Sequence, residues 1–171
     1  TMNIAVVGTG YVGLVTAVGF TSYGMRVRAG ERDPERLRLM RDERRAPFFE
    51  AGLDELVDEA VSGGLLTFHE SNAEAAERAV AVFLAVPTPP SEDGSADLGA
   101  VEDAIRSLAG VTGPETAVVV KSSVPPGSWR RIAAWMEEHG CDGSLVVNPE
   151  FLQEGRAVAD VLAPSRVAPR T

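Results

Sequence analysis

The chain has 171 residues, of which 44% are hydrophobic and 24% are charged, and its formal net charge is -9 at pH 7. A chain of this length buries about two thirds of its unfolded surface, so we expect one compact domain over residues 1–171. The acidic balance disfavours the clustered basic surface by which proteins bind nucleic acids or anionic lipids. We therefore expect neither a nucleic-acid partner nor a membrane partner.

Cysteine usage and hydropathy narrow the class further. The only cysteine, Cys141, excludes an internal disulfide and a zinc site built from cysteines. No stretch reaches the roughly 18 apolar residues of a membrane span, and no basic segment precedes the apolar N-terminus. These features predict a cytoplasmic protein without a metal site.

The first elements in chain order are a strand, a tight turn and a helix. The β-branched run at residues 3–7 predicts a strand, and residues 11–23 predict a helix that ends at Gly24. A second strand is expected at 26–29. The pair Asp33-Pro34 then has the N-cap and N1 proline signature of a new helix, which runs to about Arg41.

Apolar strands and amphipathic helices continue to alternate along the rest of the chain. The longest loop, residues 87–97, is rich in proline, serine and aspartate and begins where an apolar strand ends. The alternation predicts an α/β domain with a doubly wound, mainly parallel sheet covered on both faces, the Rossmann architecture. The remaining expected elements are helices at 53–61, 98–108 and 128–139, strands at 65–68, 80–86, 117–120 and 145–147, and one helix between the first two of these strands.

A glycine-rich motif stands between the first strand and the first helix. Gly8, Gly10 and Gly13 form a GxGxxG pattern that also contains Tyr11 and Val12. In a dinucleotide-binding turn, the first glycine permits the turn, the second lets the backbone approach a pyrophosphate, and the third lets the helix pack on the strand. Because the motif alone is weak, a glycine-rich turn without a ligand remains an alternative reading.

An acidic residue at the right distance strengthens the cofactor interpretation. Glu31 follows Gly8 by 23 residues, at the end of the second expected strand, where an acid accepts hydrogen bonds from the adenosine ribose. A carboxylate here also repels the 2′-phosphate of NADP, so we expect NAD. The neighbouring Arg32 leaves NADP open, because an arginine at this position accommodates that phosphate.

Beyond these motifs, the chain resembles the UDP-glucose/GDP-mannose dehydrogenase family over essentially its whole length. Departures from the family pattern are Phe49 for tyrosine, Ala51 for proline, Ser123 for threonine and Gln153 for arginine. The resemblance is carried by five blocks in order, GTGYVGLVTA at 8–17, PFFEAGLDEL at 47–56, AVPTPPSEDGSADL at 85–98, KSSVPPGS at 121–128 and NPEFLQEG at 148–155.

The resemblance implies roles for residues that match the family motifs. Arg36 corresponds to a basic residue near the adenosine ribose, although a surface arginine on a helix is the plain alternative. Val86 and Thr88 correspond to the nicotinamide side of the cofactor site. Ser123 corresponds to a hydroxyl that positions a water or the reacting oxygen. The cofactor-binding residues implied by motif and resemblance together are Gly8, Gly10, Tyr11, Val12, Gly13, Glu31, Arg36, Val86, Thr88, Ser123 and Glu154.

Two acids of the last block are four residues apart. If Pro149 opens a helix, the carboxylates of Glu150 and Glu154 share one face near its N-terminus. The resemblance implies that this segment lies against the sugar and that Glu154 is the base for a hydrolytic step. The implied catalytic residues are Ser123 and Glu154, and the implied substrate-binding residues are Glu150, Phe151, Leu152, Gln153 and Glu154.

The family reaction oxidises the C6 alcohol of a nucleotide sugar to a carboxylate with two NAD molecules and a cysteine thioester intermediate. The resemblance favours UDP-glucose over GDP-mannose and implies a homo-oligomeric full-length protein. The family's nucleophilic cysteine and most of its nucleotide-sugar pocket lie beyond the residues that match this chain, so we expect no turnover by these 171 residues. An isolated NAD-binding module and a β-hydroxyacid-type dehydrogenase are the other readings.

Several conspicuous side chains lie outside the five blocks. His69 and His139 are interpreted as surface residues, and Cys141 as a small filler residue. Trp129 and Trp135, six residues apart on one expected helix, are interpreted as core or interface residues. None of them enters the candidate site.

Overall fold

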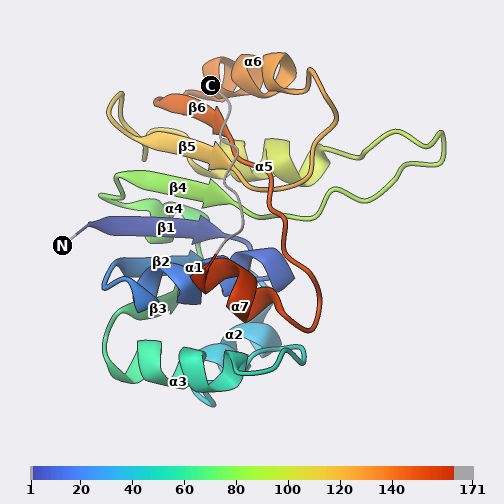
Figure 1. Cartoon of the computed structure of the whole chain (residues 1–171). Helices are drawn as coiled ribbons and strands as arrows, with labels where there is room; N and C mark the ends of the chain where they lie inside the picture. Colours follow the sequence, from blue (N-terminus) through green and yellow to red (C-terminus); the bar gives the residue numbers. More distant parts are fainter. Residues whose placement is uncertain (1, 164–171) are drawn as a thin grey trace.

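The computed structural model describes residues 2–163, so Thr1 and residues 164–171 lie outside the described part of the chain. Within that part, one sheet has all five of its neighbouring strand pairs parallel, in the order β3-β2-β1-β4-β5-β6 (Figure 1). The expected doubly wound parallel sheet is therefore confirmed. Its strands are β1 (Asn3–Val7), β2 (Arg26–Gly30), β3 (Leu66–His69), β4 (Ala81–Leu84), β5 (Ala117–Val120) and β6 (Ser144–Val147).

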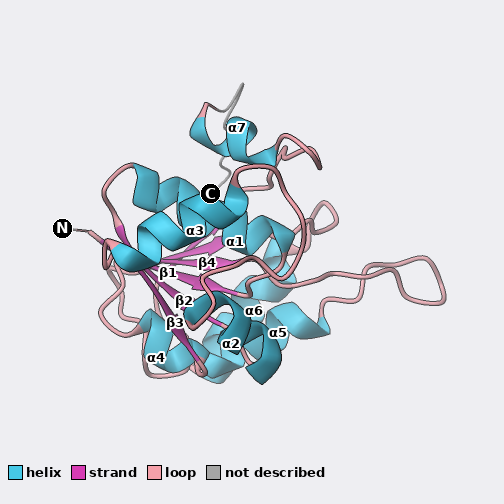
Figure 2. Ribbon diagram, turned by 90° about the horizontal axis from the view of Figure 1, so that it is seen from below, coloured by secondary structure: helices cyan, strands magenta, loops and turns pink. Residues whose placement is uncertain are grey.

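Helices cover both faces of the sheet. Figure 2, a view from below, shows α1, α3 and α7 on one side and α4, α5 and α6 on the other. The described helices are α1 (Tyr11–Ser22), α2 (Pro34–Arg41), α3 (Leu53–Ser62), α4 (Asn72–Ala76), α5 (Gly99–Ser107), α6 (Trp129–His139) and α7 (Ala157–Leu162).

Local signals set the ends of several helices. The Asp33 carboxylate accepts hydrogen bonds from the amides of Glu35 (2.9 Å) and Arg36 (3.0 Å), and Pro34 occupies the first helical position, as the sequence predicts. Gly140 ends α6 in the left-handed conformation, with φ of 67°. The first signal starts α2 directly after β2, and the second ends α6 before the chain enters β6.

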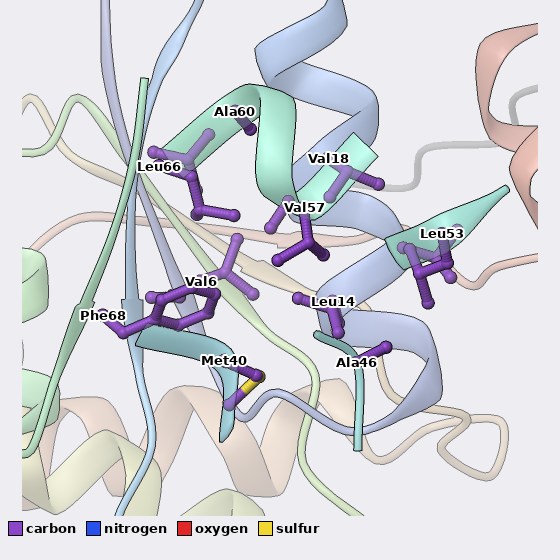
Figure 3. Close-up of a cluster of buried hydrophobic side chains, with 14 of the residues drawn as sticks. Val6, Leu14, Val18, Met40, Ala46, Leu53, Val57, Ala60, Leu66 and Phe68 are labelled. Carbon is purple, nitrogen blue, oxygen red and sulfur yellow. The ribbon is translucent and has the colours of Figure 1, made fainter. Parts of the chain in front are cut away.

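Two apolar clusters hold the helical layers against the sheet. The first joins the α1 face of β1, β2 and β3 to α1, α2 and α3, and ten of its side chains are labelled in Figure 3. Leu14, Leu53 and Val57 in this cluster have no exposed surface. The second joins the opposite face of β1, β4 and β5 to α4, α5 and α6. Because the central strands are buried on both faces, they read in the sequence as continuous apolar runs.

The strand order places a crevice at the carboxyl edge of the sheet. The chain winds from β1 outward to β3 and then returns to continue from β4 to β6. Val7 pairs with Gly30 on one side and with Leu84 on the other, so β1, β2 and β4 end level with one another. The loops that follow β1 and β4 diverge at this point, where open α/β sheets bind their ligands.

The segment after β6 differs from the expectation. Pro149 does not open a helix, because residues 148–153 have no regular secondary structure and a turn at 154–156 precedes α7. The expected common helical face of Glu150 and Glu154 is therefore wrong. The structure shows a physical reason: the amides of Gly155 and Ala157 are hydrogen-bonded to the Glu50 carboxylate, which starts the helix at Ala157.

Candidate functional site

The fingerprint glycines have the roles that the motif predicts for the turn and the packing. Gly8 has φ of 90°, its amide donates to the carbonyl of Gly30 (3.1 Å), and a Cβ on it would lie 2.7 Å from the carbonyl oxygen of Ala85. A Cβ on Gly13 would lie 1.9 Å from the carbonyl oxygen of Gly8. No other residue fits this turn or this contact between α1 and the end of β1.

Gly10 differs from the other two, because it faces open space. It is the N-cap of α1, and a Cβ on it would have no neighbour within 4 Å. Gly10 also lines the cavity described next. The first amides of a helix have no intrahelical partner and carry partial positive charge, so this end of α1 is suited to a phosphate group.

A cavity of about 620 Å³ opens at the carboxyl edge of the sheet. Its volume is in the range of sites that bind whole organic ligands. The structure brings together around it most of the site residues that the sequence predicts, namely Gly8, Gly10, Tyr11, Val12, Glu31, Arg36, Val86, Thr88, Ser123 and Glu150. Gly13 acts from beneath, through packing.

At one end of the cavity, Glu31 is held by three donors. The Thr9 hydroxyl, the Asp33 amide (2.9 Å) and the Arg36 Nε (3.2 Å) all donate to its carboxylate. Arg36 also donates through Nη2 to the carbonyl of Thr9 at 2.6 Å. An ionised carboxylate offers about four lone-pair positions, so Glu31 retains acceptor capacity for a ribose hydroxyl. Arg36 thus lies on the surface of α2 and also lines the cavity beside Glu31, and its role near the adenosine ribose stays a prediction.

At the other end, the loops after β4 and β5 are tied together. The Thr88 hydroxyl donates to the carbonyl of Ser123 at 2.7 Å. The buried Ser122 hydroxyl donates to the carbonyl of Val86 at 2.6 Å. These bonds fix the wall that presents Val86, Thr88 and Ser123 to the cavity.

Lys121 was not among the predicted site residues. Its Nζ donates to Asn148 Oδ1 at 3.0 Å, and burial lowers the pKa of its ammonium group, which the nearby Glu150 partly opposes. Lys121 and Glu150 line both the first cavity and a second one of about 580 Å³ between α1, β4 and the segment after β6. The signal available in the sequence was a lysine directly after a buried strand, at the carboxyl edge.

The segment after β6 divides between these two cavities and the solvent. Glu150, Phe151, Leu152 and Gln153 line the second cavity. Glu154 lines neither cavity; it is exposed and lies close enough to Tyr11 to help raise the pKa of that hydroxyl. The roles expected for this segment stay predictions.

The conspicuous residues outside the motifs lie away from both cavities. His69 is bound to Glu74 (2.8 Å) and His139 to Glu102 (3.2 Å). Cys141 and Trp135 are buried in the second apolar cluster, whereas Trp129 is half exposed beneath the Arg130 guanidinium. Among residues 2–163, no three histidine, cysteine or acidic side chains are grouped so that they could hold a metal ion. No helix in that range is long and apolar enough to cross a membrane.

The surfaces that line the first cavity follow one another in the order of the parts of a dinucleotide. The open N-terminus of α1 with Gly10 lies in its middle, the Glu31 and Arg36 pair lies at one end, and the Val86 and Ser123 wall lies at the other. A diphosphate, a ribose diol and a flat ring each require one of these surfaces.

Comparison with known proteins agrees with this geometry. The model of the UDP-glucose/GDP-mannose dehydrogenase family, NAD-binding domain, matches residues 2–168. The UDP-glucose 6-dehydrogenase of Pseudomonas aeruginosa is 41% identical over 173 residues, with 97% of this chain and 38% of the relative covered. The chain therefore spans about 38% of the length of this curated relative.

Two solved structures show the same fold over nearly the whole chain. A UDP-glucose dehydrogenase from Pyrobaculum islandicum is 40% identical with a TM-score of 0.86, covering 99% of this chain and 40% of that one. A GDP-mannose dehydrogenase from Pseudomonas aeruginosa is 27% identical with a TM-score of 0.90, covering 98% and 40%. The fingerprint, the acid after β2 and the family match together lead to one conclusion: the chain belongs to the UDP-glucose/GDP-mannose dehydrogenase family, as its NAD-binding domain.

Proposed function

We propose that this chain serves the oxidation of the C6 alcohol of UDP-glucose to a carboxylate, as the NAD-binding part of a UDP-glucose 6-dehydrogenase. The observation that carries the choice of sugar is the difference in identity over the same span. It is 40–41% to two UDP-glucose dehydrogenases and 27% to the GDP-mannose enzyme. This chain therefore shares more residues with the two UDP-glucose dehydrogenases than with the GDP-mannose dehydrogenase, although both solved structures have the same fold.

In this proposal, the ends of the first cavity have different tasks. Glu31 and Arg36 hold the adenosine ribose, and the α1 N-terminus at Gly10 holds the pyrophosphate. Val86 and Thr88 form the wall of the cavity next to the nicotinamide ring. When bound, NAD supplies the hydride acceptor, while the protein sets distance and excludes water.

The second cavity is our proposed sugar site, because two of its lining residues also line the first cavity. Lys121 and Glu150 stand where the two cavities meet, so a substrate between α1 and the segment 148–153 would lie next to the nicotinamide end. Ser123, which lines the first cavity, offers a hydroxyl for positioning a water or the reacting oxygen. Glu154 remains our proposed base for the hydrolytic step.

The experiment is a substrate comparison with the full-length parent protein. NADH formation is followed with UDP-glucose, GDP-mannose and UDP-N-acetylmannosamine at equal concentrations. We expect kcat/KM to be highest for UDP-glucose. A higher value for either other sugar would overturn the assignment, and NAD binding without oxidation of any of the three would leave a binding module as the function.

A further inference from the structure

Glu50 has a buried carboxylate that joins two segments far apart in the sequence. It follows Pro47 and Phe48 in the connection between α2 and α3, and only 5% of its surface is exposed. Its Oε2 accepts from the Tyr11 hydroxyl (2.7 Å) and the Gly155 amide (2.9 Å), and its Oε1 accepts from the Ala157 amide (2.8 Å). The two amides lie 105 and 107 residues further along the chain.

These donors keep Glu50 charged. Burial by itself raises the pKa of a carboxyl, but the hydrogen bonds from Tyr11, Gly155, Ala157 and Val158 hold the pKa of Glu50 below its ordinary value. The residue before α7, Arg156, offers no side-chain cap to this helix. The Glu50 carboxylate therefore supplies from a distance the acceptor that the first amides of α7 need.

Tyr11 connects the same carboxylate to the cofactor cavity. Its backbone begins α1 inside the glycine fingerprint and it lines the first cavity. Its hydroxyl donates to Glu50 and also lies 3.2 Å from the carbonyl oxygen of Gln153, while its ring contacts Phe48 with centroids 5.4 Å apart. Burial and Glu50 together raise the pKa of this hydroxyl, so it remains a donor across the physiological range.

The contacts form a closed ring that begins and ends at residues lining the cavity. From the cavity, the ring passes through Tyr11 to Glu50, from Glu50 to Gly155, and back along the chain to Glu150, which lines the cavity again. Tyr11 and Glu150 both line this cavity, so the ring meets the ligand space at two residues. Displacing the segment after β6 would leave Oε1 of the buried carboxylate without its donor and Oε2 with Tyr11 alone, which is costly.

We infer that Glu50 is a positioning residue that couples NAD binding at the fingerprint to the ordering of residues 150–162. In this clamp, the Glu50 carboxylate holds both the Tyr11 hydroxyl and the amides of Gly155 and Ala157, so a shift of either segment disturbs the other. The inference goes beyond the proposed function, because it requires only NAD binding and holds for any sugar. Coupling between two equilibria is reciprocal. Bound NAD therefore raises the ordering equilibrium constant of residues 150–162 by the same factor by which ordering of this segment raises the affinity for NAD.

The test uses hydrogen exchange of the intact protein with and without NAD, together with calorimetric titration of NAD. Glu50→Gln replaces one carboxylate oxygen by a donor that faces the amide of Gly155 or Ala157. Tyr11→Phe keeps the ring but removes the bonds of the hydroxyl to Glu50 and to the carbonyl of Gln153, which link the cofactor side to this segment. Glu55→Gln, the same change on the exposed face of α3, is the matched control.

In the wild type, we expect NAD to slow exchange at residues 155–162. Glu50→Gln should speed exchange there by about tenfold or more without NAD, the loss expected for one hydrogen bond to a charged group, while β1 and β4 keep their protection. It should also weaken NAD binding, by the factor by which NAD slows exchange in the wild type. Tyr11→Phe should bind NAD but lose the NAD-dependent protection of 155–162, and Glu55→Gln should match the wild type.

Three results would overturn the inference. The first is unchanged exchange at 155–162 in Glu50→Gln. The second is an equal acceleration in β1 and β4, which would make Glu50 a contributor to global stability only. The third is full NAD-dependent protection in Tyr11→Phe, and this variant decides the matter if Glu50→Gln does not fold.

Discussion

The glycine-to-alanine change is expected to have different effects at Gly13 and at Gly10 of the same motif, on stability at the first and on cofactor binding at the second. At Gly13, a Cβ would lie 1.9 Å from the carbonyl oxygen of Gly8, and that oxygen belongs to backbone that the neighbouring strands hold in place. At Gly10, a Cβ would have no neighbour within 4 Å, and the φ of -67° is one that alanine readily adopts. Gly13→Ala should therefore damage the fold, whereas Gly10→Ala should damage only the site.

The magnitudes follow from these contacts. Relief of the Gly13 overlap requires α1 to move by more than an ångström, so we expect the upper end of the overpacking range, about 3 kcal/mol or more. For a chain of this size that loss lowers Tm by roughly 6–12 °C. Gly10→Ala should instead leave stability within about 1 kcal/mol of the wild type, because alanine lowers the entropy of the unfolded chain but is a poorer N-cap than glycine. Its methyl group enters the cavity where the backbone meets the pyrophosphate, so NAD binding should weaken at least about tenfold.

Thermal unfolding by circular dichroism and calorimetric titration with NAD measure both effects on the same samples. The reasoning is refuted if Gly13→Ala melts with the wild type, because the packing of α1 on the turn would then be loose. It is equally refuted if Gly10→Ala binds NAD as tightly as the wild type, because the cofactor would then not approach this part of the backbone.

Three further predictions concern single acids. Glu31→Ala should weaken NAD by about 1–3 kcal/mol in calorimetry, because it removes a ribose acceptor and leaves the Nε of Arg36 without its acceptor; tighter binding of NADP than NAD to the wild type would point instead to Arg32. The pKa of Glu50 is held below its ordinary 4.5, so its stabilisation is fully present above that pH and is lost as the pH falls through the lower folded value. The difference in unfolding free energy between wild type and Glu50→Gln should therefore shrink in denaturant titrations below pH 4.5, and a constant difference would contradict the charged clamp. In the full-length enzyme, Glu154→Gln should lower steady-state turnover by roughly 10² to 10⁴ and trap a covalent adduct visible by intact mass, whereas an adduct in Glu150→Gln instead would transfer the hydrolytic role to Glu150.

The features that the sequence predicts correctly depend on residues close together in the chain. The GxGxxG turn, the Asp33-Pro34 helix start and the alternation of apolar strands with amphipathic helices are local patterns, and each predicts its element to within about two residues. The acid after β2 is also local to its motif. Chain winding and handedness then allow few arrangements of such elements, so the parallel sheet and its carboxyl-edge site were predictable.

The tertiary structure decided what depends on contacts between distant segments. Pro149 and the spacing of Glu150 and Glu154 are compatible with a helix, and nothing local shows that Glu50, about a hundred residues earlier, binds the amides that start α7 instead. Likewise, the sequence places Lys121 after a strand but does not show its contact with Asn148, 27 residues later. A buried carboxylate takes whichever donors the fold brings to it, and the identity of those donors is set only once the sheet and both helical layers are assembled.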